Sequence, residues 1–291
     1  MGDIIIRSLE TMAEINAAEE VQRATWSMPD LEIIPAHALH AMQHSGAVLL
    51  GAFDGERLVA FTFGILGTVD TPERIDQVAA ARLKMYSVIA GVLPEYQSRD
   101  VGYRLKMAQR DFALRIGVRL ITWTYDPLES LNGRFNIGKL GAVCRRYLRH
   151  FHGDMSGINN GLQTDRFEVE WWVTNNRVTA RAARKWRPLR LDALLAGGAL
   201  LVNEAGFNEA GLPTPPANYV SQPSNLMLVE IPSSFQTIKK NDLALAQRWR
   251  SHTRDVFEGL FDSGFIVTDF VAHEDEHGRP HSYYLLTYGD A

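Results

Sequence analysis

The segment from Gly91 to Leu105 combines residue types that could bind a phosphate group. A short apolar strand runs through Pro94 into a helix, and polar residues together with Gly102 occupy the junction. The first backbone N–H groups of a helix have no acceptor within it, and they lie at the positive end of the helix dipole. We therefore expect an anion here, and phosphate first. An ordinary strand–helix connection that binds nothing is the alternative.

The residues after the junction predict the helix that must position it. Apolar residues three or four positions apart form one stripe: Val101, Leu105, Ala108, Phe112 and Ile116. At about 3.6 residues per turn, such spacing places them on one face. Arg99, Lys106 and Arg110 are expected on the opposite face. Gly117 should end the helix, and residues 118–124, rich in β-branched and aromatic types, should form the next strand.

The remaining segments are expected to complete a mixed sheet with helices. The predicted strands lie at 4–8, 47–53, 58–66, 85–92, 166–174, 226–231, 265–272 and 282–287. The predicted helices lie at 12–25, 35–44 and about 242–262. Asp54-Gly55, between two of these strands, is typical of a hairpin turn. The Gly, Asn and Ser-rich stretch 153–161 predicts an irregular loop, which could cover a site.

Several of these segments carry a family resemblance. Residues 92–102 read V-x-P-E-Y-Q-x-x-D-x-G, residues 123–129 read W-T-Y-D-P-L-E, and Asn132 and K-L-G at 139–141 follow. In this order they resemble the GNAT acyltransferase superfamily, whose pyrophosphate loop is usually written Q/R-x-x-G-x-G/A. With L-Q-T-D-R-F-E-V-E-W-W at 162–172, the chain is similar to predicted GNAT-type acetyltransferases that carry a C-terminal extension.

The resemblance implies a fold and a division of the chain. The fold is α/β (α+β), with a GNAT-like mixed, splayed central sheet flanked by helices and a smaller α/β extension at the C-terminus. Residues 1–190 should form the GNAT-like acyl-CoA-binding domain. Residues 191–291 should form a strand–helix–strand–strand extension, which we expect to be structural or to form one wall of the acceptor pocket.

The resemblance also implies which residues bind the donor, acetyl-CoA or another acyl-CoA. Backbone groups near Val92 would bind the pantetheine and polarise the thioester, and the loop N–H groups would hold the pyrophosphate. The implied donor-binding residues are Val92, Leu93, Gln97, Ser98, Arg99, Asp100, Val101, Gly102, Tyr103 and Asn132. No metal is expected.

Three positions depart from the superfamily pattern. Asp100 replaces the first loop glycine, which adds a negative charge and removes a residue that tolerates positive φ. Val88 stands where many members have a carboxylate base, and Ile137 where many have a tyrosine acid. The loop therefore predicts donor binding more directly than catalysis.

Other side chains remain as candidates for proton transfer. Tyr147 and His150 are the predicted catalytic residues, with His150 and His152 expected on a strand. Glu168 and Glu170 should share one strand face, where they could draw an amine substrate or simply face solvent.

Composition limits the remaining classes of function. The chain has 291 residues, 46% of them hydrophobic, and a formal charge of −4, which argues against a nucleic-acid binder. No apolar stretch is long enough for a membrane span. The N-terminus shows no apparent signal peptide. Cys144 is the single cysteine, which excludes an internal disulfide, so we expect a cytoplasmic protein.

The clusters of basic residues and of histidines can each be explained without a functional site. Basic residues gather at 145–149 and 181–190, as solvated faces or, for the first cluster, as a contact to the CoA 3′-phosphate. His37, His40 and His44 project from one side of a helix but lack matched ligands for a metal site. Cys144 is expected to be a small buried hydrophobe.

These observations leave three hypotheses. The first is an acyl-CoA-dependent N-acyltransferase that transfers an acyl group directly to an unidentified small-molecule or peptide amine. The second is a CoA- or metabolite-binding protein without catalysis, and the third is a partner-binding scaffold with a vestigial loop. The partners are then acyl-CoA and an amine, with no nucleic acid and no membrane, and a homodimer is left open.

Overall fold

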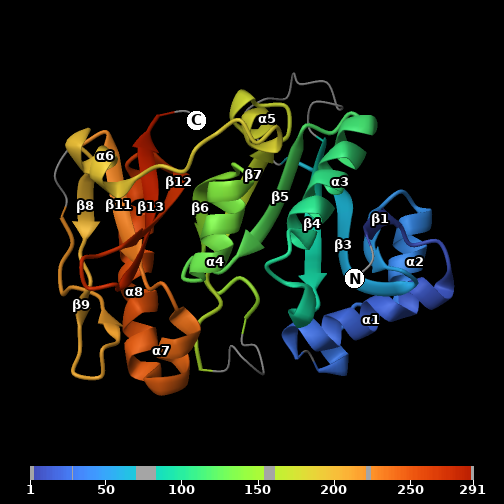
Figure 1. Cartoon of the computed structure of the whole chain (residues 1–291), viewed down its shortest axis with the longest axis horizontal. Coiled ribbons are helices and arrows are strands. Elements are labelled where there is room, and N and C mark those ends of the chain that lie inside the picture. The colour runs from blue at the N-terminus through green and yellow to red at the C-terminus, as the bar shows by residue number, and fades with distance from the viewer. Residues whose placement is uncertain (1–2, 28, 70–82, 154–160, 221–223, 290–291) are drawn as a thin grey trace. The chain divides into compact units, whose positions relative to one another are not determined.

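The computed structural model describes residues 3–27, 29–69, 83–153, 161–220 and 224–289. The chain divides into two compact units, Met1–Trp123 with Trp172–Thr174 and Thr124–Trp171 with Asn175–Ala291, which we call the N-terminal and C-terminal units. Each is a mixed α/β structure (Figure 1), as expected. The units divide the chain after Trp123, and the boundary expected at residue 190 stays a prediction.

The N-terminal unit is built on one sheet. Its helices and strands are β1 (Ile4–Ser8), α1 (Met12–Trp26), α2 (Ala36–His44), β2 (Val48–Asp54), β3 (Arg57–Thr68), β4 (Leu83–Val92), α3 (Val101–Arg115) and the first part of β5 (Leu120–Tyr125). The strand order is β1–β2–β3–β4–β5. All neighbours are antiparallel except β4 and β5, which are parallel. The predicted hairpin at Asp54-Gly55 is confirmed, with Gly55 at φ +61°.

The helices α1 and α3 cover opposite faces of this sheet. A Cβ added to Gly64 of β3 would lie 3.1 Å from Nε2 of Gln109 on α3. A Cβ added to Gly91 of β4 would lie 2.6 Å from the ring of Trp26 on α1. Gly91 pairs with Phe61, three residues from Gly64, and side chains alternate between the two faces of a sheet. Both helices are thus fixed against strands that lead to the loop after β4.

The helix α3 departs from its predicted amphipathic pattern at two positions. Val101 and Leu105 are buried as expected, but Ile116, expected on the same stripe, is 43% exposed because the helix ends at Arg115. Lys106 was expected to face solvent and is 5% exposed. That prediction is wrong, because the strands pack around a wider arc of the helix than the apolar stripe alone covers.

The C-terminal unit holds a second group of strands. Its helices and strands are α4 (Ser130–Gly133), a π-helical turn (Arg134–Lys139), β6 (Val143–Leu148), β7 (Arg166–Trp172), α5 (Asn176–Ala182), α6 (Leu191–Ala196), β8 (Leu200–Asn203), β9 (Gly206–Phe207), β10 (Pro213–Thr214), β11 (Leu226–Ile231), α7 (Phe235–Asn241), α8 (Leu243–Asp262), β12 (Phe265–Glu274) and β13 (Pro280–Tyr288). The order of its main sheet is β7–β6–β12–β13–β11–β8. A short pair, β9–β10, stands apart from that sheet.

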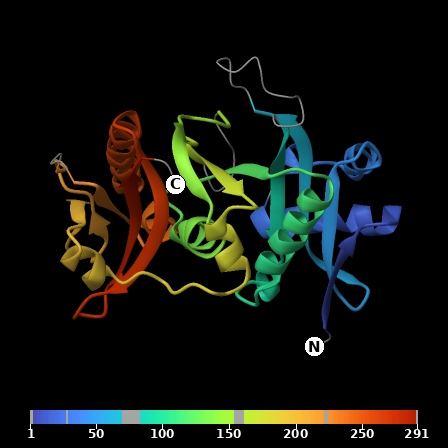
Figure 2. The ribbon, with the colours of Figure 1, turned by 90° about the horizontal axis from the view of Figure 1, so that it is seen from above.

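The helix α8 packs along this sheet, against β11 and β12 (Figure 2). It begins where Asp242 accepts a hydrogen bond from the Leu245 N–H at 2.8 Å. Phe257 of α8 meets Phe167 of β7 at 4.7 Å between ring centroids, and Tyr284 of β13 at 5.6 Å. These three fully buried rings join the helix to strands from both ends of the unit's sequence.

Other sequence expectations have mixed outcomes here. The strand Leu226–Ile231 and the helix over 242–262 are confirmed. His150 and His152, expected on a strand, lie in a turn after β6, so that prediction is wrong; His150 takes φ +47°, which a strand does not allow. Residues 154–160 of the expected loop lie outside the described residues.

Candidate functional site

The loop after β4 winds through left-handed conformations into α3. A 3₁₀ turn, Pro94–Tyr96, follows the strand, and Gln97 to Asp100 form consecutive turns. Ser98 has φ +60° and Asp100 has φ +64°. Asp100 thus stands at a position with positive φ, which a glycine would adopt freely and which aspartate adopts at a modest cost. Such alternation of backbone conformation turns successive N–H groups towards one side, where they can bind an anion.

The residue at the N-cap position of α3 does not cap the helix with its own side chain. Asp100 occupies the N-cap position, but its carboxylate makes no capping hydrogen bond. Within the helix the first bond runs from Arg104 N–H to the Asp100 carbonyl, at 2.9 Å. The positive end of a helix of 15 residues is therefore presented to the loop.

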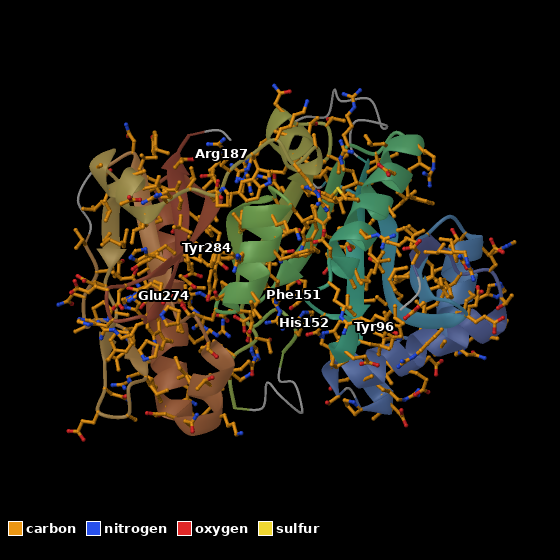
Figure 3. All side chains as sticks on the ribbon, viewed as in Figure 1. Tyr96, Phe151, His152, Arg187, Glu274 and Tyr284 are labelled. Carbon is orange, nitrogen blue, oxygen red and sulfur yellow. The ribbon has the colours of Figure 1, made fainter. Side chains whose placement is uncertain are left out.

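Side chains of the N-terminal unit hold the loop in place. Tyr96, labelled in Figure 3, lies in this loop, and its hydroxyl donates to the Asp54 carboxylate at 2.8 Å. Gln97 Nε2 donates to the Val92 carbonyl at 3.1 Å. The Leu93 N–H donates to the Val59 carbonyl at 2.9 Å, which continues the sheet one residue beyond β4. The predicted donor-binding residues from Val92 to Tyr103 are thus gathered in one braced loop.

The strand β4 contains a bulge before the loop. Ile89 pairs with Phe63 and Ser87 pairs with Gly64, so Val88 is an extra residue in β4. A bulge leaves one residue out of the ladder and turns its backbone groups away from the neighbouring strand. Val88 was expected as an apolar replacement for a base. Its side chain cannot accept a proton, but the backbone groups of a bulged residue can form hydrogen bonds with a ligand.

The strands β4 and β5 are paired over a short stretch. Among the described residues, their parallel register consists of Met85 with Ile121 and Tyr86 with Thr122. β4 continues from this point through the bulge to the loop. We call the point just beyond the second pair the fork.

At the fork lies the buried amine of Lys106. Its Nζ donates to Ser87 Oγ at 2.8 Å and to Gln109 Oε1 at 3.0 Å, and it lies 4.0 Å from the centroid of the Trp123 ring. Burial lowers the pKa of Lys106 to about 7. The ring face acts in the opposite direction, because it favours the cation. Sequence reasoning missed this group, since its position next to Leu105 carries no signal of burial.

The predicted catalytic residue Tyr147 belongs to a buried network in the C-terminal unit. Its hydroxyl donates to Asp165 at 2.8 Å, and Arg254 Nε donates to the same carboxylate oxygen at 2.8 Å. The other oxygen of Asp165 accepts from the His150 backbone N–H at 3.0 Å. Burial raises the pKa of Tyr147. Asp165 thus brings Tyr147 and the backbone of His150 together, while the exposed imidazole of His150 belongs to the turn.

Two acidic residues, Asp126 and Glu129, lie where β5 leads into α4. Asp126 binds Arg250 through both guanidinium Nη atoms, at 2.8 and 2.5 Å. Glu129 is half-buried, and its pKa is raised by burial and by Asp126. Asn132 follows on α4 and is exposed. A carboxyl group that retains its proton more readily than usual suits proton exchange, and the sequence signal for Glu129 was its place in the W-T-Y-D-P-L-E segment.

Two basic residues of β6 are matched by carboxylates of the same unit. Arg145 pairs with Glu170 at 3.3 Å and Arg146 with Glu168 at 3.0 Å. The strand face of Glu168 and Glu170 is thus occupied by ion pairs, and Phe167 and Trp171 on the other face are fully buried.

In the second basic cluster, Arg181 is not on a solvated face. It is 5% exposed and binds Asp269 at 2.8 Å. Cys144 is fully buried, and burial raises the pKa of its thiol, as suits a buried hydrophobe. Over the described ranges of the chain, no group of three or more His, Cys, Asp or Glu is placed to hold a metal ion. Nor does any described helix combine the length and apolar character that a membrane crossing demands.

A hollow of about 600 Å³ lies in the C-terminal unit beside α8. Aromatic and aliphatic side chains, including Tyr219, Leu260 and Tyr288, form most of its lining. Its serine hydroxyls bond to nearby backbone carbonyls: Ser224 to Gly198 and Leu226, and Ser263 to Gly259. This hollow offers no reactive group for the chemistry considered above.

Comparison with known proteins finds acetyltransferases among solved structures, at low sequence identity. No family model matches the chain, and no curated protein matches it. The ribosomal-protein-S18-alanine N-acetyltransferase of Escherichia coli is 14% identical, over 60% of this chain and 96% of that chain, with a TM-score of 0.46. NAA60 of Arabidopsis thaliana, solved with a bisubstrate analogue, is 16% identical over 58% and 98%, with a TM-score of 0.47.

An N-acetyltransferase from Staphylococcus aureus is 12% identical, over 60% of this chain and 100% of that chain, with a TM-score of 0.46. Each of these alignments covers about three-fifths of this chain. At this level of similarity we base the function on the geometry of the loop, the bulge and the fork.

Proposed function

We propose that the chain is an acyl-CoA-dependent N-acyltransferase that transfers an acyl group, with acetyl the first expectation, directly to an amine. The observation that carries the proposal is the braced, left-handed loop between β4 and the uncapped N-terminus of α3. It combines an anion site with a bulged strand that leads into it.

In this proposal the loop N–H groups from Gln97 to Tyr103 bind the donor pyrophosphate, and the pantetheine lies along β4 towards the bulge. Backbone groups near Val92 and at Val88 bind its amides and polarise the thioester carbonyl. Asp100 weakens the anion site by its charge, so its carboxylate must be directed away from the phosphates. Asn132 is assigned to the donor from the resemblance.

The reaction needs positioning and one proton acceptor. The neutral amine nitrogen attacks the thioester carbon, the C–N bond forms, and the C–S bond breaks as CoA leaves as a thiolate. The nitrogen loses a proton to a base, and the thiolate gains a proton from an acid or from water. Tyr147 and His150 remain our assigned proton-transfer groups, and Glu129 joins them because of its raised pKa.

Donor binding is tested by calorimetry with acetyl-CoA. We expect the wild-type chain to bind and the Gly102→Trp variant not to bind, because an indole at the start of α3 fills the anion site. Gly67→Trp, at a position where a Cβ meets nothing closer than 4.0 Å, is the matched control and should bind normally. Absence of binding by the wild-type chain would overturn the proposal and favour the scaffold hypothesis.

Catalysis is tested separately, with acetyl-CoA and a broad panel of amines. Turnover should fall in Tyr147→Phe, His150→Ala and Glu129→Gln if each moves a proton, and an unchanged rate removes that residue from the mechanism. Tight donor binding without turnover of any amine would favour the second candidate, a CoA-binding protein without catalysis. The apolar Val88 and Ile137 side chains at the usual acid–base positions support this candidate.

A further inference from the structure

The amine of Lys106 is buried in the N-terminal unit, and the donor site proposed above leaves it without a role. Its partners are Ser87, Gln109 and the Trp123 ring, and none of the three carries a negative charge. Removing an ammonium from water is costly, and buried lysines are ordinarily paired with a carboxylate. An apolar side chain of similar length would fill the same space without this cost. The charge is therefore retained against a cost in stability.

The position of the amine is as informative as its burial. Ser87 and Trp123 come one residue after the second registered pair of β4 and β5. Their side chains point to the same face of the sheet, because each lies two residues after a member of the first pair. The amine contacts both side chains, so it lies between the two strands at the fork. Its partner Ser87 comes one residue before the bulge at Val88.

Two partners of the amine, Gln109 and Ser87, are also hydrogen-bonded to each other. Gln109 Nε2 donates to Ser87 Oγ at 3.2 Å, while its Oε1 accepts from Lys106. Gly64 of β3 makes room for this amide, because a Cβ there would lie 3.1 Å from Gln109 Nε2. Two of the three ammonium N–H groups thus have oxygen acceptors, and the third faces the ring.

Among the described residues, the hydrogen-bond and ring partners of the Lys106 amine carry no charge that offsets its burial. Burial lowers its pKa to about 7. The adjacent cations of α3 are directed elsewhere: Arg104 donates to the Ile4 carbonyl on β1, and Arg110 to the Val173 carbonyl. The groups that face the amine are Ser87 from β4, Gln109 from α3 and Trp123 from β5. Lys106 therefore changes charge near neutral pH.

We propose that Lys106 is a positioning residue for the acyl donor, whose ammonium ties β4 to the Trp123 ring at the fork and so fixes the bulged strand segment along which the donor lies. Because it concerns the donor site, the proposal rests on the proposed function. Loss of the proton removes the attraction to the ring and one donor group. The β4 segment is then held less firmly, and the donor binds more weakly.

The test is acetyl-CoA affinity, measured by calorimetry at pH 6 and pH 8. We expect the wild-type affinity to fall at least threefold more over this range than that of Lys106→Met, which cannot change charge. The titration of the CoA phosphate, with a second pKa of about 6, appears equally in both proteins. Lys84→Met, also on β4 of the same unit, is the matched control and should follow the wild type.

A second variant separates positioning from simple loss of packing. Ser87→Ala leaves the amine in place but removes one acceptor, so it should weaken binding at pH 6 in the same direction as Lys106→Met. The double variant should then bind no more weakly than Lys106→Met alone, because the two residues act as a unit. The proposal is overturned if Lys106→Met keeps the wild-type affinity at both pH values. If the wild-type chain binds no CoA at either pH, the proposed function itself fails, and this proposal with it.

Discussion

The helices α1 and α3 belong to the same unit and have 15 residues each, yet their N-termini differ. Thr11 caps α1 by accepting from the Glu14 N–H at 3.2 Å, and Glu14 accepts from the Thr11 N–H in return. Arg7 adds an ion pair to Glu14 at 2.6 Å. At α3, Asp100 takes the same position without capping. The N-cap side chain thus closes the start of α1 but makes no capping hydrogen bond at the start of α3, where we propose that the donor binds.

The buried faces of the two helices differ in the same way. α1 buries Gln22, whose amide bonds to the Ile34 N–H at 2.9 Å and to the Ile34 carbonyl at 3.1 Å. α3 buries Lys106, an amine that has no carboxylate partner in the part of the chain that the structure describes. The Gln22 amide of α1 stabilises a connection within the fold. Burial of the Lys106 amine of α3 instead lowers the stability of the fold. A residue retained at such a cost points to function rather than to stability.

The largest expected effect is a gain in stability from Lys106→Met. The pKa of Lys106 is about 7, against an ordinary value of 10.5. At pH 7 we expect the variant to raise the free energy of unfolding by on the order of 3 kcal/mol, after allowing for the lost hydrogen bonds. Unfolded Lys106 holds its proton up to its ordinary pKa, so wild-type stability rises as pH increases above 7. The difference should be full below that pH and vanish above about 10.5.

Urea unfolding at pH 6, 8 and 10 measures this difference. The Lys84→Met variant serves as the control, since it removes a lysine from β4 without emptying the fork. A Lys106→Met protein less stable than the wild type at pH 7 would contradict the contrast between the two helices.

The second effect has the opposite sign. We expect Gln22→Leu to lower the free energy of unfolding by about 1–3 kcal/mol, because it leaves the Ile34 N–H and carbonyl without their partners. Thermal unfolding of this variant beside Lys106→Met tests the comparison directly. Equal signs for the two substitutions would mean that the buried polar groups of α1 and α3 are alike.

The third effect concerns the capped helix end. Thr11→Ala should cost about 1 kcal/mol of stability, because it removes the acceptor for the Glu14 N–H. Thr11→Ser keeps the hydroxyl and should cost far less. Chemical denaturation resolves the two variants, and equal stability of the alanine and serine proteins would show that the capping box contributes nothing.

The smallest effect on stability is expected at the uncapped end. Asp100→Asn should change the free energy of unfolding by less than about 0.5 kcal/mol, since asparagine also tolerates positive φ. Acetyl-CoA affinity should rise severalfold, because a negative charge leaves the anion site. Calorimetry at low and high salt checks this, and the gain should shrink as salt screens the charge. Weaker binding by the variant would show that the Asp100 carboxylate itself contributes to the donor site.

Local sequence signals predicted the elements that depend on neighbouring residues. The strands Ile4–Ser8 and Leu226–Ile231, the hairpin at Gly55 and the start of α3 after Asp100 are found where expected. Each depends on alternation, turn chemistry or helical periodicity within a few residues. The short helices α5, α6 and α7 were not predicted, because none is long enough to show a periodic stripe.

Long-range pairing decided the environments of the site residues. The sequence placed Tyr147 among the acid–base candidates. Its hydroxyl donates to Asp165, just before β7, and the same carboxylate accepts from Arg254 on α8. The assignment of His150 to a strand failed because the chain turns there onto the Asp165 carboxylate. Neither partner is adjacent in the sequence, so no local pattern indicates them.

The sequence by itself determined the strand, the loop and the helix start at which we propose an anion site, because backbone N–H groups at a helix start follow from local conformation. Tertiary structure decided that Asp100 adopts the left-handed conformation, that Val88 is a bulge and that Lys106 is buried at the fork. These depend on the register between strands and on the packing of α3, which bring together residues far apart in the chain. The proposed anion site follows from local geometry, whereas the burial of the Lys106 amine at the fork exists only in the folded protein.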